Sequence, residues 1–71
     1  MNIGYKIGDK IREYRKNLKM SQLDLAVEME VNQSTLWSWE NGKTFPTIQN
    51  LVKLADYFGL KLWAFFKELD L

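Results

Sequence analysis

The 71-residue sequence contains no cysteine, no histidine and only one proline. Without cysteine there is no disulfide framework and no thiolate metal site, and without histidine there is no imidazole ligand and no near-neutral general base. No apolar run approaches the roughly 20 residues that span a bilayer, and residues 1–20 are too charged for the apolar region of a signal peptide. We therefore expect a cytoplasmic protein that is not an enzyme and uses no metal or other cofactor.

Hydrophobic residues make up 46% of the chain and aromatic residues 14%, which is enough for one core in so short a chain. We expect a single domain over residues 1–71. The net charge of +1 is unevenly distributed, because residues 1–20 carry six basic and two acidic side chains while residues 21–40 carry four acidic and no basic ones. A basic first segment is typical of a solvated helix face or of a surface that contacts phosphate.

Apolar residues recur at helical spacing in five segments, which predicts an all-α fold of five helices without a strand. The helices are expected over residues 5–18, 22–29, 33–41 and 48–58, with a short last one around residues 62–69. The residues expected to face the core are Ile7, Ile11, Tyr14 and Leu18, then Leu25, Ala26 and Met29, then Leu36 and Trp39, then Ile48, Leu51, Leu54, Ala55 and Phe58, and finally Phe65, Phe66 and Leu69.

The segment from Ser21 to Gly42 has the pattern of a helix-turn-helix. Ser21 is a favourable N-cap with Asp24 three residues later, and Asn32 is the corresponding cap of the second helix. That second helix directs Leu36, Trp39 and Glu40 to one side and Ser34, Trp37 and Ser38 to the other. A polar face without charge is suited to reading base edges, which makes this a candidate recognition helix.

Three segments of the chain resemble the lambda-repressor-like family of DNA-binding domains, often called the Xre or Cro type. They are IGDKIREYRKNLKMSQLDLA, VNQSTLWSWENGK and PTIQNLVKLADYFGL. The resemblance covers almost everything from Ile7 to about Phe66. It implies a five-helix bundle that binds a palindromic operator in double-stranded DNA, usually as a homodimer, and that regulates transcription, most simply as a repressor.

Roles carry over from the family to matching positions of this sequence. The resemblance implies base reading by Gln33, Ser34, Trp37 and Ser38, and phosphate contacts by Gln22, Asn41 and Lys43; Arg12 and Lys16 of the basic first helix join this phosphate set. It also implies a buried ion pair between Arg15 and Glu40. For Gln22 the alternative is a solvated polar residue at a helix start, and for Trp37 packing on the first helix ranks before contact with a thymine methyl or with a protein partner.

Several positions depart from the family pattern. Glu30 stands where the turn usually has glycine, so a left-handed conformation there would cost about 1 kcal/mol. Trp37 and Ser38 replace a small residue and a frequent arginine, and Thr44 and Phe45 stand where basic residues are common. We therefore expect weak DNA binding by a single protomer.

Two further expectations concern partners. Trp63, Phe65 and Phe66 are the candidate dimer interface, since large exposed apolar side chains often mark a contact surface, although Phe65 and Phe66 can instead cover the core. The main alternative function is a protein-interaction module, of the antitoxin or dimerisation type, that keeps the fold and has lost strong DNA binding.

Overall fold

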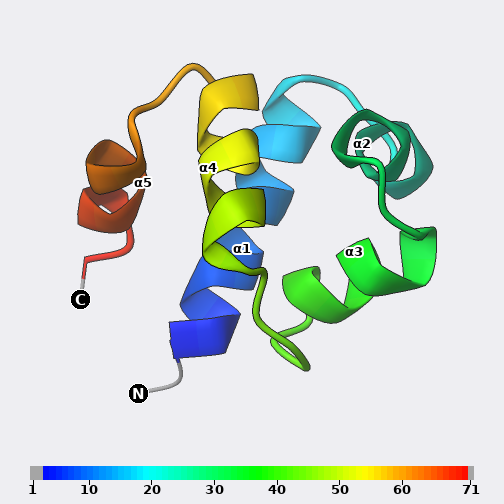
Figure 1. Ribbon diagram of the computed structural model, residues 1–71, viewed down its shortest axis with the longest axis horizontal. Coiled ribbons are helices and arrows are strands. Elements are labelled where there is room, and N and C mark those ends of the chain that lie inside the picture. Colours follow the sequence, from blue (N-terminus) through cyan, green and yellow to red (C-terminus); the bar gives the residue numbers. More distant parts are fainter. Residues whose placement is uncertain (1–2, 71) are drawn as a thin grey trace.

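The computed structural model describes residues 3–70, and within this range it contains five helices and no strand. The helices are α1 (Ile3–Asn17), α2 (Gln22–Met29), α3 (Gln33–Glu40), α4 (Ile48–Tyr57) and α5 (Leu62–Glu68). In Figure 1, α4 lies in front of α1 at the centre, with α2 and α3 to one side and α5 to the other. The predicted all-α class, helix number and helix order are confirmed, with α1 beginning at Ile3 rather than near Tyr5.

The helix boundaries follow from local capping chemistry. At the start of α2, Ser21 Oγ accepts a hydrogen bond from Asp24 N, and Asp24 Oδ2 accepts one from Ser21 N, both at 3.0 Å. This is the predicted capping box. Thr47 caps α4 in the predicted way, since its hydroxyl accepts from Asn50 N at 3.2 Å. Asn32 occupies the cap position of α3 but makes no side-chain capping bond.

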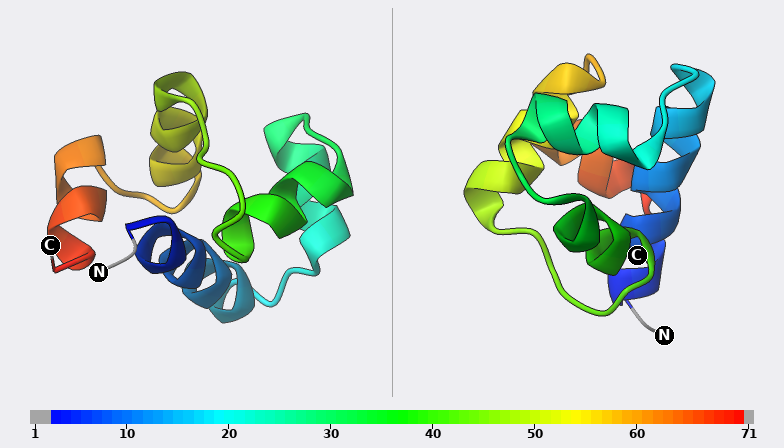
Figure 2. Two further views of the ribbon diagram at one scale, coloured as in Figure 1. Left: turned by 90° about the horizontal axis from the view of Figure 1, so that it is seen from below. Right: turned by 90° about the vertical axis from the view of Figure 1, so that its right-hand side faces the viewer.

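A residue in the left-handed backbone region follows each of the five helices, namely Lys19, Glu30, Gly42, Gly59 and Asp70. Glu30 has φ 59°, so the chain does adopt the left-handed conformation at the position where the family usually has glycine. Gly42 and Gly59 have φ 70° and 79° after α3 and α4, as their positions predicted. The short α2–α3 turn then makes the two helices cross steeply, as Figure 2 shows.

The core receives one fully buried apolar side chain from every helix, namely Ile11, Leu25, Leu36, Leu54 and Phe65. Burying such a side chain stabilises the fold by about 1.5–3 kcal/mol each. The prediction of a core position is wrong for two residues. Ile48 is 61% exposed because it occupies the first turn of α4, beyond the end of the buried stripe. Leu18 is exposed because it follows the last residue of α1. None of the helices over residues 3–70 is long and apolar enough to cross a membrane.

Close contact between α1 and α3 is possible because Gly8 lacks a side chain. A Cβ atom at this position would lie 2.5 Å from the carbonyl oxygens of both Trp39 and Glu40. The C-terminal end of α3 therefore lies directly on α1. This contact fixes the orientation of α3, and with it the face that α3 exposes.

Candidate nucleic-acid interface

Helix α3 has one buried face and one exposed face. Leu36, Trp39 and Glu40 are buried, whereas Gln33 and Ser34 are exposed in its first turn. This is the predicted division of the helix. The exposed face carries no charge, because Glu40 is the only ionisable residue of α3 and its side chain is fully buried.

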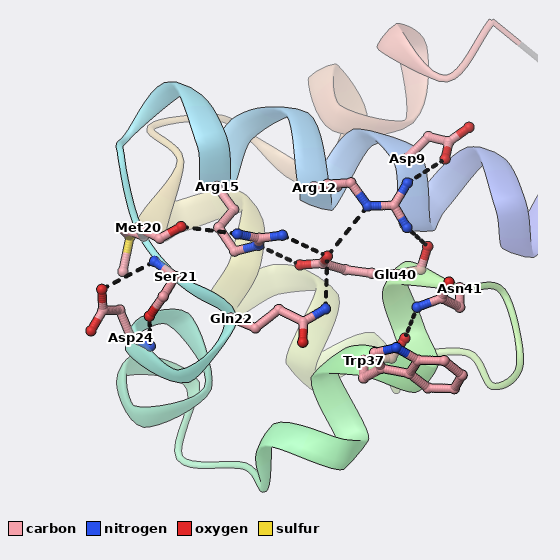
Figure 3. Close-up of polar contacts among 10 residues, drawn as sticks. All are labelled: Asp9, Arg12, Arg15, Met20, Ser21, Gln22, Asp24, Trp37, Glu40 and Asn41. Carbon is pink, nitrogen blue, oxygen red and sulfur yellow. Dashed lines mark hydrogen bonds and ion pairs between the residues drawn. The ribbon is translucent and has the colours of Figure 1, made fainter.

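Beneath α3, the carboxylate of Glu40 is held by the predicted ion pair with Arg15. Arg15 Nε donates to Glu40 Oε2 at 2.7 Å and Arg15 Nη2 donates to Oε1 at 3.0 Å, so the pair is bidentate (Figure 3). These hydrogen bonds, donated to the Glu40 carboxylate, raise the pKa of Arg15 above its ordinary value. Arg15 also donates to the carbonyl oxygen of Met20 at 2.9 Å, so one guanidinium joins α1, α3 and the chain before α2.

Arg12 belongs to the same buried network, which the sequence did not reveal. Its Nη2 donates to the carbonyl oxygen of Glu40 at 2.8 Å, its Nε lies 3.5 Å from Glu40 Oε1, and its Nη1 lies 3.3 Å from Asp9 Oδ1. Arg12 caps the C-terminal end of α3, where the helix dipole favours a positive charge. The Arg12 side chain is still 34% exposed, so its predicted phosphate contact stays a prediction beside this contact with α3. Arg12 lies three residues before Arg15 and therefore on the same face of α1, which is the feature of the sequence that pointed to a contact near Glu40.

Gln22 also turns toward Glu40. Its amide nitrogen donates to Glu40 Oε1 at 3.2 Å, which ties the first turn of α2 to α3. Glu40 thereby receives hydrogen bonds from α1 and α2 together, as Figure 3 shows. Neither the phosphate contact nor the solvated alternative describes this arrangement fully, and a phosphate contact by the same side chain remains a prediction.

The remaining sequence-predicted contact residues lie on α3, in the loop that follows it and on α1. Asn41 Nδ2 donates to the carbonyl oxygen of Trp37 at 2.9 Å, so this amide stabilises the end of α3. Lys43 is exposed in the loop that follows, and Lys16 is exposed on α1. Ser38 is half-buried and Trp37 is 46% exposed, and packing of the covered part of Trp37 on the first helix stays a prediction.

The three aromatic residues proposed for a dimer interface separate into different environments. Phe65 is fully buried and cannot contribute to an interface, because the seven-residue α5 turns this side chain into the core. Phe66 is half-buried against the core and in edge contact with Phe65. Of the three, Trp63 alone is largely exposed to solvent, with 68% of its surface accessible.

Polar side chains of α1 hold the end of α5 in place. Tyr14 Oη donates to the Glu68 carboxylate at 2.6 Å, and this hydrogen bond raises the pKa of Tyr14 to about 12. Lys6 Nζ donates to the carbonyl oxygens of Leu69 and Asp70 at 3.4 and 3.2 Å. These contacts were not predicted, because a basic stripe on α1 gives no indication of the distant segment that it meets. They position Trp63 at the end of the molecule away from α2 and α3.

The five-helix arrangement and the anchored, polar-faced α3 define a helix-turn-helix domain. A family model described as "Helix-turn-helix" matches residues 11–62. The chain belongs to this family, of the Cro and Xre type, as the sequence resemblance predicted.

The comparisons with relatives agree with this assignment. Over 65 residues, covering 90% of this chain and 48% of the relative, the chain is 35% identical to the HTH-type transcriptional regulator DicA of Escherichia coli. It is 33% identical over 57 residues, covering 80% of this chain and 51% of the relative, to the cryptic phage CTXphi transcriptional repressor RstR of Vibrio cholerae. The chain thus spans about half the length of these two relatives.

A solved structure matches the whole fold. The restriction-modification controller protein C.AhdI from Aeromonas hydrophila superposes with a TM-score of 0.82 at 26% sequence identity. The match covers 93% of this chain and 100% of that chain.

Proposed function

We propose that this protein is a sequence-specific regulator of transcription that places α3 in the major groove of double-stranded DNA. The observation that carries the proposal is the division of α3, whose buried face is fixed by Leu36, Trp39 and the Glu40 network while its polar face remains exposed. A helix of this kind is rigid enough to read base edges and has hydrogen-bonding groups to do so. The names of the relatives, which are transcriptional regulators and repressors, support a role as a repressor.

Within this proposal, Gln33 is the principal base reader. It is the first residue of α3 and is exposed, so its amide can offer one acceptor and two donors to a base edge. Adenine presents the complementary pair of groups in the major groove. Ser34 and Ser38 are proposed to supply further hydrogen-bonding groups. The proposed phosphate contacts are Lys43 and Lys16, which are exposed, and Asn41 and Gln22, which are half-buried.

Binding rather than catalysis is the proposed activity, because the chain has neither histidine nor cysteine. No group of three or more acidic residues within residues 3–70 is placed to hold a metal ion. We also propose a homodimer on a palindromic operator, since Trp63 is exposed on α5, which lies on the opposite side of the molecule from α2 and α3. A cytoplasmic location follows from DNA as the partner.

The test compares two variants on a site selected from a random DNA pool and on scrambled DNA. Gln33→Ala should weaken binding to the selected site by about 1–3 kcal/mol and relax the choice at one base pair per half-site. Lys43→Ala should weaken binding to both DNAs alike and lower the salt dependence by about one unit per protomer.

The two variants serve as controls for each other, because one removes a base contact and the other a phosphate contact. If Gln33→Ala lowers affinity equally for selected and scrambled DNA, Gln33 is not a base reader. If the wild-type protein binds no duplex at low salt, the proposed function is wrong, and the alternative of a protein-interaction module with this fold replaces it.

A further inference from the structure

We propose that the indole of Trp37 reads the 5-methyl group of a pyrimidine, so that each half-site carries thymine or 5-methylcytosine at the position facing this side chain. This inference depends on the proposed function and adds the chemical feature that α3 selects. It assigns specificity to a residue that offers an extended apolar surface where hydrogen-bonding side chains would ordinarily be expected.

Trp37 is the largest apolar surface on an otherwise polar helix face. Its neighbours one turn earlier, Gln33 and Ser34, are exposed and uncharged, while Trp37 itself is 46% exposed. Figure 3 shows its indole projecting from α3 on the side away from Arg15 and Glu40. The core of the domain therefore does not cover this side chain completely, and the exposed part of the ring is available to a ligand of α3.

The backbone that carries the indole is well fixed. Asn41 Nδ2 donates to the carbonyl oxygen of Trp37 at 2.9 Å, and the Asn41 N–H donates to the same oxygen at 3.0 Å. Trp39 and Glu40, two and three residues further along, are buried. Only two side-chain torsions remain to be ordered on binding, so a tryptophan here contributes contact area at low entropic cost.

The chemistry of the major groove limits what such a surface can select. Base edges there present hydrogen-bond donors and acceptors, and the C5-methyl group of thymine is the apolar exception. The face of the indole ring against a donor or acceptor would desolvate it without replacing its hydrogen bond, which is unfavourable; only the Nε1–H at the ring edge can donate. Against a methyl group the same indole buries apolar surface. The methyl of 5-methylcytosine occupies the same ring position and would be read in the same way.

The spacing along α3 places this position relative to the adenine proposed for Gln33. Four residues separate Gln33 from Trp37, which corresponds to about 6 Å along a helix. Base pairs are spaced by about 3.4 Å. With α3 lying along the groove, the methyl-bearing pyrimidine is therefore about two base pairs from the pair that Gln33 contacts.

The test replaces thymines of the selected site one at a time by deoxyuridine, which removes the methyl group and nothing else. We expect one position per half-site where this weakens wild-type binding about four-fold, the value of burying one methyl group. In Trp37→Ser the same replacement should have no effect, and in Trp37→Leu, which keeps an apolar side chain, a penalty should remain. Placing 5-methylcytosine there, with its paired guanine, should bind more tightly than unmethylated cytosine.

Val27→Ser is the matched control, because it removes an exposed apolar side chain from α2 instead of α3. It should retain the full deoxyuridine penalty, and circular dichroism should show that all variants keep their helices. The proposal is overturned if deoxyuridine has no effect at any position, or if its penalty persists in Trp37→Ser. Either result leaves the proposed function intact provided that the wild type discriminates selected from scrambled DNA.

Discussion

At the scale of single residues, Glu40 determines how α3 is held. Its carboxylate is fully buried and accepts hydrogen bonds from Arg15 and Gln22, with Arg12 a further 3.5 Å contact. Burying charges costs several kcal/mol per ion, and only complete pairing compensates for it. The pairing is complete here, since no buried side-chain nitrogen or oxygen within residues 3–70 lacks a partner. Removing one member of this network is therefore more disruptive than its few hydrogen bonds suggest.

Glu40→Ala should lower the free energy of unfolding by about 3–5 kcal/mol, because it leaves the buried guanidinium of Arg15 without a counter-charge. Urea-induced unfolding followed by circular dichroism measures the change. Glu28→Ala, which removes an exposed carboxylate from α2, is the control and should change stability by less than about 0.5 kcal/mol. Equal unfolding midpoints for Glu40→Ala and the wild type would contradict the structural role of the pair.

Tyr14 offers a titration that reports on the α1–α5 contact. Its pKa is raised to about 12, first by the hydrogen bond to Glu68 and then by burial, so the fold favours the protonated hydroxyl. This contribution to stability is complete below the unfolded pKa of about 10 and is lost as the pH rises through about 12. At pH 11, ultraviolet absorbance of phenolate should show Tyr14 still protonated in the wild type, and largely ionised in Glu68→Gln. An unchanged titration in Glu68→Gln would show that Glu68 does not cause the shift.

At the scale of elements, the contact between α1 and α3 depends on Gly8. On an exposed helix face Gly→Ala stabilises by about 1 kcal/mol, but here the new Cβ would meet two backbone carbonyl oxygens at 2.5 Å. Backbone atoms at the end of α3 cannot move aside as a flexible side chain can. Gly8→Ala is therefore expected to destabilise the fold instead of stabilising it.

Gly8→Ala should destabilise the fold by about 1–3 kcal/mol through overpacking, and it should also displace the Arg12 contact to the Glu40 carbonyl oxygen. Thermal unfolding measures the loss. Gln49→Ala, on the exposed side of α4, controls for placing alanine in a helix and should be neutral or slightly stabilising. A Gly8→Ala protein as stable as Gln49→Ala would mean that α1 and α3 are further apart than the structure shows.

The sequence predicted the elements better than it predicted their mutual arrangement. Helical periodicity and capping residues such as Ser21 and Thr47 act locally, so the helices and their starts were predictable. The Arg15–Glu40 pair followed from the family resemblance. The engagement of Arg12 by α3 was not predicted, because its spacing from Arg15 does not show how closely α1 and α3 approach at Gly8.

The errors in the predicted core and interface have a related cause. In α5, apolar residues occupy most sides of a short helix, so periodicity could not decide that Phe65 is buried and Trp63 exposed. Ile48 fits the apolar repeat of α4 but lies in its first turn, beyond the helices that cover the rest of the stripe. The exposed face of α3 was predictable from the sequence, whereas the roles of its residues toward DNA are properties of a complex.

At the scale of the whole molecule, size and charge favour cooperative rather than independent binding. The described chain measures 28 × 25 × 22 Å, and its net charge is only +1. Few phosphate contacts are available to one protomer, so its affinity for DNA should be low at physiological salt. Two protomers on half-sites about 34 Å apart are close enough to touch across a small interface. Contact between them would then supply the affinity that a single domain lacks.

Trp63 is the side chain best placed to provide this contact, because it is 68% exposed on α5, the helix that lies on the opposite side of the molecule from α2 and α3 (Figure 2). Burying a tryptophan at the centre of an interface is worth about 2 kcal/mol or more. Trp63→Ser should therefore weaken self-association, measured by sedimentation, and reduce binding to a two-half-site duplex by at least about 2 kcal/mol. Binding to a single half-site should not change, because Trp63 is remote from α3.

Val27→Ser removes a comparably exposed apolar side chain from the opposite end and should leave both affinities as in the wild type. One protein per two-half-site duplex at saturation would rule out the dimer, and an equal loss on single and double sites would place Trp63 in the fold rather than in an interface.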